Sequence, residues 1–438
     1  MRKLFACVFV VVGAQSLSAQ QHELDRPRVY EGPPLSLPAA LREAGEKNPT
    51  LIALRRQFDS TKFKTAEQRF LSPPMLETQI WHWPVNTLNP TNTNMYMFMA
   101  TQEFPGRGKR PLRAEAAQKE SQVAEADIAV RAQQILNEVK QQYTELFLAR
   151  RAIEVLRANA GVLRQIADFS QAKYATGRSS QQDVLKSVVE LSRLHDDLIV
   201  LDLQADLASA RLNTLLDRAP EAPVGQMTEP RDRTLLAQVA DLQRLALEQQ
   251  PELARMRVEI ERLQTDLALT RQDYKPDYSV QAGYMLTPNM TDGWLARVGI
   301  TWPRAPWSRG AIDTRVGEAN ARIDAAKAQL RAMESAVRLA VQDAFIRVKA
   351  TEQRVALLRT TLLPQSRQAL EVSRIAYQTD RLDALGVVDS ERVLLTVELD
   401  YSRSLSDLER ATADLEQAVG TELAPAMLAE VDTSGVNQ

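Results

Sequence analysis

The feature that most constrains this chain is a run of about a hundred residues, from Leu112 to Leu216, that has the pattern of two long helices. No proline lies between Leu112 and Thr176, and apolar residues recur every three or four positions, as in a coiled-coil seam. At 1.5 Å per residue the first helix would be roughly 95 Å long. A turn is predicted at Thr176–Ser180. A hairpin of this length has no compact core of its own, so it must pack against other hairpins.

The chain repeats itself at a shift of 203 residues, which predicts a second hairpin. The segment Tyr174–Arg178 returns as Tyr377–Arg381. A tandem duplication of a unit of about 200 residues follows, with four helical arms in one chain. Gly161 falls on Pro364, so a weak point is expected at the same height in both long helices.

Composition fits a mainly α-helical protein with a small β part. Of the 438 residues only 5% are aromatic, and glycine and proline number 16 and 21, which suits long helices better than a sheet-rich domain. The formal net charge of −2 leaves no basic excess to neutralise phosphates, so nucleic acid is not expected as a partner. The sequence also lacks an apolar run of about eighteen residues, so no transmembrane helix is predicted.

The N-terminus has the pattern of a secretory signal peptide. Met1-Arg2-Lys3 precedes a short apolar run, and small residues end the segment near Ala19. The single cysteine, Cys7, lies inside this run, so the mature chain is expected to contain no thiol and no disulfide. Beyond it, one helix is expected from about Leu37 to Phe70, where Ser72-Pro73-Pro74 follows.

Two short β-hairpins are predicted, one before each helical hairpin. Their strands lie at about 75–83 and 95–104 in the first half, and at about 277–286 and 294–302 in the second. In the second pair one face is apolar with aromatics at its ends, as in a membrane β-strand of nine to eleven residues. A soluble hairpin with a half-buried face is the alternative. Because four strands cannot close a barrel, closure in lipid would need other copies of the chain.

The predicted organisation follows these two repeats. It consists of a signal peptide at 1–19, a first repeat at 20–226 with its helical hairpin at about 112–216, a second repeat at 227–420 with its helical hairpin at about 311–419, and a C-terminal tail at 421–438.

These pieces resemble the TolC family of outer-membrane efflux channels across nearly the whole mature chain. The resemblance is carried by Leu37–Leu41 with Asn48-Pro49, by the duplicated strand and helix hairpins, and by two tips that begin at Tyr174 and Tyr377. Within that family, the segment Gln102–Arg110 and the methionines Met95, Met97 and Met99 are similar to the heavy-metal efflux, or CzcC-like, branch.

The resemblance implies an assembly and a location. It implies a homotrimer in the outer membrane of a Gram-negative bacterium, with twelve strands closing one barrel and twelve helical arms forming a periplasmic tunnel. Such a channel is the passive exit duct for substrates, here metal cations, delivered by a periplasmic adaptor and an inner-membrane pump, often of the resistance–nodulation–division type. Drug efflux, type I secretion and a non-channel periplasmic coiled-coil adaptor remain the alternatives.

The resemblance also implies two sets of functional residues near the hairpin tips. The residues expected to dock the adaptor are Tyr174, Gly177, Arg178, Tyr377, Asp380 and Arg381. The acidic residues expected to narrow the periplasmic entrance are Asp183 and Asp389.

The sequence departs from the family pattern at this entrance. At the shift of 203, Asp183 falls on Gly386 and Asp389 falls on Lys186, and Asp380 stands where glycine is usual. A single acidic ring, or a pairing of Lys186 with Asp389, is therefore as well supported as two rings.

Chemistry other than transport has little support in the sequence. His22, His82 and His195 have no ligand spacing, so no metal site and no cofactor are expected. Met95, Met97 and Met99 share one face of a strand and could offer soft ligands, although such a stripe is usually apolar strand surface. The sequence contains no glycine-rich phosphate loop and no histidine placed beside a nucleophile, so no enzymatic activity is expected.

Overall fold

A computed structural model describes residues 30–81, 83, 85–87, 89, 92–177, 180–229, 233–288, 290–379 and 381–430, without the side chains of Asp183, Ala384 and Glu430. The predicted signal peptide, the tip residues Arg178 and Asp380, and the last part of the predicted tail lie outside these residues.

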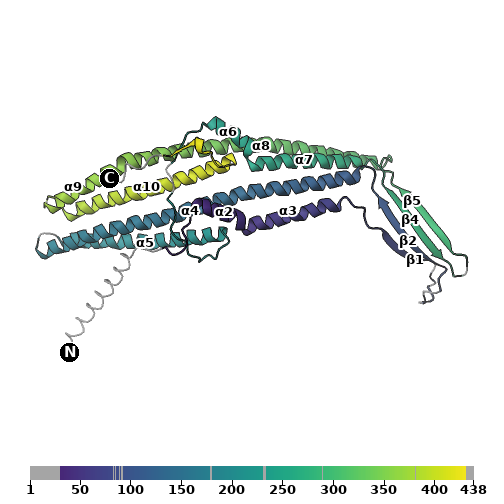
Figure 1. Cartoon of the computed structure of the whole chain (residues 1–438), viewed down its shortest axis with the longest axis horizontal. Helices are drawn as coiled ribbons and strands as arrows, with labels where there is room; N and C mark the ends of the chain where they lie inside the picture. The colour runs from purple at the N-terminus through teal and green to yellow at the C-terminus, as the bar shows by residue number, and fades with distance from the viewer. Residues whose placement is uncertain are drawn as a thin grey trace, which may run out of the picture. The chain divides into compact units, whose positions relative to one another are not determined.

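Most of the described chain is helical, as predicted. The helices are α2 (Leu37–Lys47), α3 (Pro49–Glu67), α4 (Lys109–Ala175), α5 (Gln181–Leu215), α6 (Val239–Gln249), α7 (Pro251–Gln272), α8 (Arg309–Leu357), α9 (Leu363–Gln378) and α10 (Ala384–Val419), with a π-helical turn at Leu358–Leu362 and a 3-10 turn at Pro425–Met427. Helices α4 and α5 form one antiparallel pair and α9 and α10 another (Figure 1).

The chain divides into two compact units that do not coincide with the predicted repeats. The first unit is drawn from Met1–Pro49, Ala132–Glu248 and Val337–Gln438, and the second from Thr50–Arg131 and Gln249–Ala336. Because α4 and α8 are long enough to enter both units, each predicted repeat contributes residues to both.

The core of the first unit is the apolar seam predicted from the spacing. Val139, Leu146 and Ile153 of α4 are fully buried, and Leu212 of α5 packs in the same cluster. This cluster also contains residues of the second hairpin, among them Leu370, Val387 and Val388. The two hairpins therefore bury their apolar faces against each other, as their length requires.

The two long helices respond differently to their predicted weak points. Helix α4 continues through Gly161 without a break, because glycine lowers helix propensity but keeps its N–H. In the second hairpin a π-helical turn separates α8 from α9 just before Pro364. Proline lacks an N–H and crowds the preceding turn, and a wider turn accommodates it.

The prediction of a single helix from Leu37 to Phe70 is wrong, because the structure has two helices there. Helix α2 ends at Lys47, and Asn48 has an extended ψ of 123° before Pro49 begins α3. The residue before a proline is disfavoured in the helical region, which explains the break. The Asn48 amide donates a hydrogen bond to the Leu215 carbonyl at 2.9 Å, which fixes this joint.

Four antiparallel strands in the second unit form one sheet. They are β1 (Met75–Trp81), β2 (Met95–Phe104), β4 (Tyr278–Leu286) and β5 (Gly293–Ile300), in the order β1-β2-β4-β5. The central pairing of β2 with β4 joins the two repeats, with Phe98 opposite Tyr284. Strands β1 and β5 each have one edge that no described strand covers.

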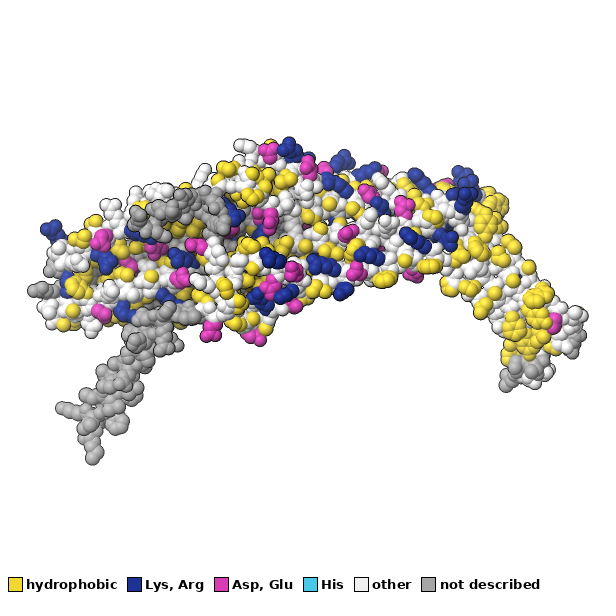
Figure 2. Space-filling view, in the orientation of Figure 1, with side chains coloured by type: hydrophobic (Ala, Val, Ile, Leu, Met, Phe, Trp, Pro, Cys, Tyr) yellow, Lys and Arg dark blue, Asp and Glu magenta, His cyan; other side chains and the backbone are white. Residues whose placement is uncertain are grey.

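One face of this sheet is apolar and exposed. The register places Thr78, Phe98, Tyr284 and Trp294 in one row, so they share this face, and Trp294 is 83% exposed. Hydrophobic side chains gather over the sheet, whereas the helices show mixed charge (Figure 2). The row on the opposite face contains Gln79, Met97 and Met285.

A second, two-stranded sheet was not predicted. It pairs β3 (Arg233–Leu235) with β6 (Leu428–Glu430). Strands of three residues are too short to give an alternation signal. Within the described residues, no helix is long and apolar enough to cross a membrane.

Candidate functional site

The first hairpin tip is built by a glycine turn. Gly177 has φ +72°, a conformation that glycine adopts without strain, and its N–H donates to the Tyr174 carbonyl at 2.9 Å. Tyr174 itself is 47% exposed. Helix α5 then begins at Gln181.

The second tip uses an aspartate cap instead. The Arg381 N–H donates to the Ala376 carbonyl at 2.8 Å and ends α9. The Asp383 carboxylate accepts from the Gly386 N–H at 2.9 Å and begins α10. Arg381 is exposed. The two tips therefore turn the chain by different means, a glycine in the first and a capping aspartate in the second.

Tyr377 lies between the two hairpins, although the sequence placed it among the docking residues. Its ring contacts Phe169 of α4 edge-on at 5.4 Å between centroids, and its hydroxyl lies 3.2 Å from the Ser170 Oγ. The Lys173 Nζ is 4.1 Å from the ring centroid and donates to the Tyr377 carbonyl. Tyr377 is only 7% exposed, so in this structure it joins α9 to α4.

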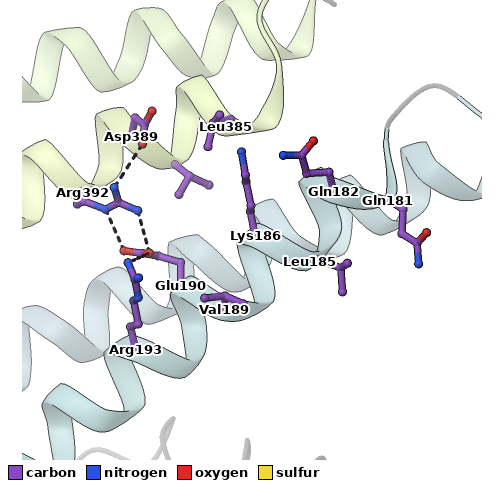
Figure 3. A pocket seen from close by; sticks show the side chains of 11 residues that line it. Gln181, Gln182, Leu185, Lys186, Val189, Glu190, Arg193, Leu385, Asp389 and Arg392 are labelled. Atoms are coloured by element: carbon purple, nitrogen blue, oxygen red, sulfur yellow. Dashed lines mark hydrogen bonds and ion pairs between the residues drawn. The ribbon is translucent and has the colours of Figure 1, made fainter.

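A groove of about 550 Å³ lies between the beginnings of α5 and α10 (Figure 3). Its polar side chains include Lys186, Glu190 and Arg193 from α5, and Asp389 and Arg392 from α10. The structure therefore brings two of the predicted entrance residues, Lys186 and Asp389, to one groove. Asp183 occupies the first turn of α5, and its side chain is outside the description.

Arg392 holds this groove together. Its guanidinium donates to both Glu190 carboxylate oxygens, from Nε at 3.1 Å and from Nη2 at 2.9 Å, and its Nη1 lies 3.5 Å from Asp389. Such a two-pronged contact fits the planar guanidinium. The hydrogen bond to Glu190 raises the pKa of Arg392. Arg193 adds a second cation 3.6 Å from Glu190.

The pairing of Lys186 with Asp389, one of the alternatives that the sequence offers, is not a contact within the described part of this chain, and a pairing between neighbouring copies stays a prediction. Asp389 pairs there with Arg392, one turn further along the same helix. Lys186 extends from α5 toward the beginning of α10 (Figure 3). The sequence reasoning missed Glu190 and Arg392, although both lie within two turns of the predicted residues.

A buried carboxyl group lies next to this groove. Glu391 of α10 is 2% exposed, and its Oε2 has no hydrogen-bond partner among the described residues. Burial raises its pKa to about 7, with Arg374 opposing the shift and Glu398 adding to it. At the shift of 203 the equivalent residue is Val188, which is 44% exposed. Glu391 could have been singled out from the sequence, because a carboxyl stands there at the position where the first repeat has a valine.

Metal-binding groups do not cluster in the part of the chain that the structure describes. No group of three or more histidine, cysteine, aspartate or glutamate side chains is placed to hold an ion there. The three methionines of β2 lie on the sheet face opposite the apolar one, and Met285 of β4 stands opposite Met97. The Gln281 amide donates to the Met99 sulfur at 3.4 Å.

Comparison with known proteins finds similarity to outer-membrane efflux proteins in both the sequence and the fold. Residues 75–218 match the profile of the outer membrane efflux protein family. The chain is 24% identical over 399 residues to the cobalt-zinc-cadmium resistance protein CzcC of Cupriavidus metallidurans, covering 90% of this chain and 92% of that one.

Solved outer-membrane channels share the fold. One is CusC, with a TM-score of 0.74 and 15% identity over 88% of this chain and 92% of that chain. Another is VceC from Vibrio cholerae, with a TM-score of 0.71 and 18% identity over 88% of this chain and 96% of that chain. Residues 75–218 are therefore similar to the outer membrane efflux protein family, and the chain shares the fold of the solved channels of this kind.

Proposed function

We propose that three copies of this chain form the outer-membrane exit duct of a tripartite efflux system that exports metal cations. The observation that carries the proposal is the sheet, which has one exposed apolar face and two edges that no described strand covers. In lipid an open edge leaves backbone N–H and C=O groups without partners, so β5 of one copy must pair with β1 of the next. Three sheets of four strands then close a barrel of twelve.

Uncovered apolar stripes on the helices support the same assembly. On α5 the exposed residues Ile199, Leu203 and Leu207 fall on one narrow side of the helix, and Leu185 and Val189 continue that side into the groove toward α10. On α8 the exposed residues Leu339, Ile346 and Leu357 likewise fall on one narrow side. Because the stripes are on different hairpins, contact between them is head-to-tail, and such an interface generates a ring.

The hairpin tips are the proposed periplasmic end. Here the first tip at Tyr174 and Gly177 and the second tip at Arg381 dock an adaptor, and the adaptor connects the duct to an inner-membrane pump. Asp389 lines the entrance, where three copies would place three carboxylates and three Arg392 side chains around one axis. Arg178, Asp380 and Asp183 stay proposed members of these sites from their positions in the sequence.

Metal cations are proposed as the substrate because the sequence is similar to a cobalt-zinc-cadmium resistance protein over most of its length. A strain lacking this gene should accumulate and be inhibited by these cations, and the intact gene should restore growth. Inhibition by antibiotics or bile salts alone would favour drug efflux, and loss of an exported protein would favour secretion. Fractionation tests the non-channel alternative, because an adaptor would not enter the outer membrane as a heat-resistant trimer.

A further inference from the structure

The methionines of the four-stranded sheet are an exception to the scatter of the metal-binding groups. Five of the 11 methionines of the chain lie in its strands, and the register places all five on the face opposite the apolar one. They are Met75, Met95, Met97, Met99 and Met285. The apolar face of the same four strands contains no methionine and takes its bulk from leucine, isoleucine, valine and aromatic residues. Methionine used only as apolar filler is expected on both faces, so its restriction to one face indicates another role.

Three of these thioethers come together where β2 pairs with β4. Met97 is the direct strand partner of Met285, and Met99 follows Met97 on the same face. Side chains opposite each other in antiparallel strands have Cβ atoms about 4.5–5.5 Å apart, which lets two flexible thioethers reach one ion. Met99 is 9% exposed, and Met97 and Met285 are half-buried, so the three side chains form a partly sheltered patch.

Glycines beside these methionines leave room for the thioethers to move. Gly283 is the strand partner of Met99, and Gly293 is the strand partner of Met285. A Cβ at Gly293 would lie 3.1 Å from the Met285 Cε. A Cβ at Gly283 would lie 3.0 Å from the Met99 Cγ and 2.9 Å from the Phe98 carbonyl oxygen. Glycine at both positions therefore gives the thioethers the space that ligands need to close around an ion.

Polar groups on the same face add negative charge and orient one sulfur. Glu77 of β1 is exposed and is the strand partner of Met99. The Gln281 amide donates to the Met99 sulfur at 3.4 Å, and a thioether sulfur has a second lone pair that remains for a metal. Arg297 also lies on this face, but it stands on β5, two strands away from β2. By register the carboxylate is therefore closer to Met99 than the guanidinium is.

We propose that Met97, Met99 and Met285 form a binding site for a soft monovalent cation, Cu(I) or Ag(I), on the inner wall of the barrel. Thioethers are soft ligands, and they select such cations over hard ones. A neutral thioether holds the ion less firmly than a thiolate does, so the ion can leave again, as passage through a channel requires. The inference rests on the proposed function, because the methionine face lines the duct only if the apolar face meets lipid. It adds soft monovalent cations to the metal cations that the duct is proposed to pass.

Protection from oxidation tests the site on the full chain purified from the outer membrane. Peroxide converts methionine to its sulfoxide, and mass spectrometry of peptides measures the rate at each position. The probe is silver nitrate in chloride-free buffer, because Ag⁺, unlike copper, keeps one oxidation state in peroxide. At about ten times its dissociation constant, Ag⁺ should slow oxidation of Met97, Met99 and Met285 roughly tenfold. Met290, which is 78% exposed and lies between β4 and β5, should oxidise at an unchanged rate.

Leucine substitutions separate metal binding from packing. Met97→Leu with Met285→Leu keeps the apolar volume but removes two of the three sulfurs. It should weaken Ag⁺ binding by roughly tenfold or more, a loss that even an outer partner of a metal ligand can cause, and Met99 should lose its protection. Met290→Leu is the matched control and should leave the protection of Met97 unchanged. Glu77→Gln should weaken binding less than the double variant, and its effect should be smaller at high salt.

A second measurement does not depend on how the variants fold. X-ray absorption at the silver edge of the unsubstituted trimer should show sulfur neighbours around the ion. A first shell of oxygen or nitrogen alone would overturn the site. Equal protection of Met290 would mean that Ag⁺ binds any thioether, and equal protection by Zn²⁺ would mean that the site does not select soft cations; either result would overturn the proposal.

The outcomes also separate this site from the proposed function. A trimer by native mass in which Ag⁺ protects no methionine would overturn the cation site and leave the duct intact. A single copy by native mass would overturn the barrel of three copies, and with it the placement of these methionines on the wall of a channel.

Discussion

The first and second helical hairpins correspond at a shift of 203 residues, but their local structures differ at three places. Helix α4 runs unbroken through Gly161, whereas the second hairpin makes a π-helical turn before Pro364. Val188 of the first is partly exposed, whereas Glu391 of the second is buried. Tyr174 faces outward, whereas Tyr377 is held between hairpins. The differences place a π-helical turn, a buried carboxyl group and the residue of the internal contact in the second hairpin.

Introducing a proline at the equivalent position of the first hairpin should have the largest effect of the changes considered. Gly161→Pro should destabilise α4 by about 3 kcal/mol or more, because the proline removes a hydrogen bond where no π turn prepares for it. Hydrogen exchange of the flanking amides measures the local loss. Gly161→Ala is the matched control, since a Cβ there meets no described atom within 4 Å, and it should slow exchange slightly. Equal protection in the unsubstituted protein and in both variants would mean that α4 accepts a proline without a π-helical turn.

Changing Glu391 tests the titrating group. Its pKa is raised from 4.5 to about 7 by burial, so its contribution to stability is complete below about pH 4.5 and is lost as pH rises through 7. The loss corresponds to about 3 kcal/mol between these limits. Glu391→Gln should remove this pH dependence, and the variant should be the more stable protein at pH 8. Hydrogen exchange of α9 and α10 amides at pH 5 and 8, corrected for intrinsic rates, measures the change.

An unchanged difference between pH 5 and pH 8 in Glu391→Gln would assign the dependence to another group. Arg374 and Glu398 are the charged groups that act on Glu391. A Glu398→Gln variant should lower the pKa of Glu391 and shift its transition to lower pH, because it removes a neighbouring negative charge.

More of the fold than of the candidate site could be predicted from the sequence, because the fold follows from spacing within single elements. Apolar spacing alone dictates long hairpins, since a stripe at three- and four-residue intervals must be buried, and strand alternation dictates the sheet. The contact of Arg392 with Glu190 depends on how two helices from distant parts of the chain are rotated toward each other, which spacing within one helix does not encode. Pro49 indicates the break at Asn48, but the apolar residues on both sides of the break have the spacing of one continuous helix. Strands β3 and β6 are too short to show an alternation of apolar and polar residues in the sequence.

Removing the Tyr377 hydroxyl tests the internal contact. Tyr377→Phe should cost about 1 kcal/mol, because the buried Ser170 hydroxyl loses its partner while the aromatic packing on Phe169 remains. In detergent-separated single chains, Tyr174→Phe should change nothing, since that ring is half-exposed. Thermal unfolding of the two variants, compared at one scan rate, gives the difference. A larger loss from Tyr174→Phe in single chains would contradict the assignment of Tyr377 as the internal residue.

The smallest effect is expected at the entrance, and it depends on which cation neutralises Asp389. Here Arg392 contacts both Glu190 and Asp389, whereas Lys186 only reaches toward α10. Arg392→Gln should therefore release Asp389 and leave Glu190 with Arg193, and it should increase cation selectivity, measured as a shift of reversal potential in planar bilayers. Lys186→Gln should shift it in the same direction but less, and Asp389→Asn should shift it the opposite way. All three shifts of reversal potential should be smaller at high salt. The Asp389 side chain is more than half exposed, and dissolved ions screen exposed charges more strongly than buried ones. If Lys186→Gln exceeds Arg392→Gln, the neutralising cation comes from a neighbouring copy, and the entrance of the trimer differs from the groove of the single chain.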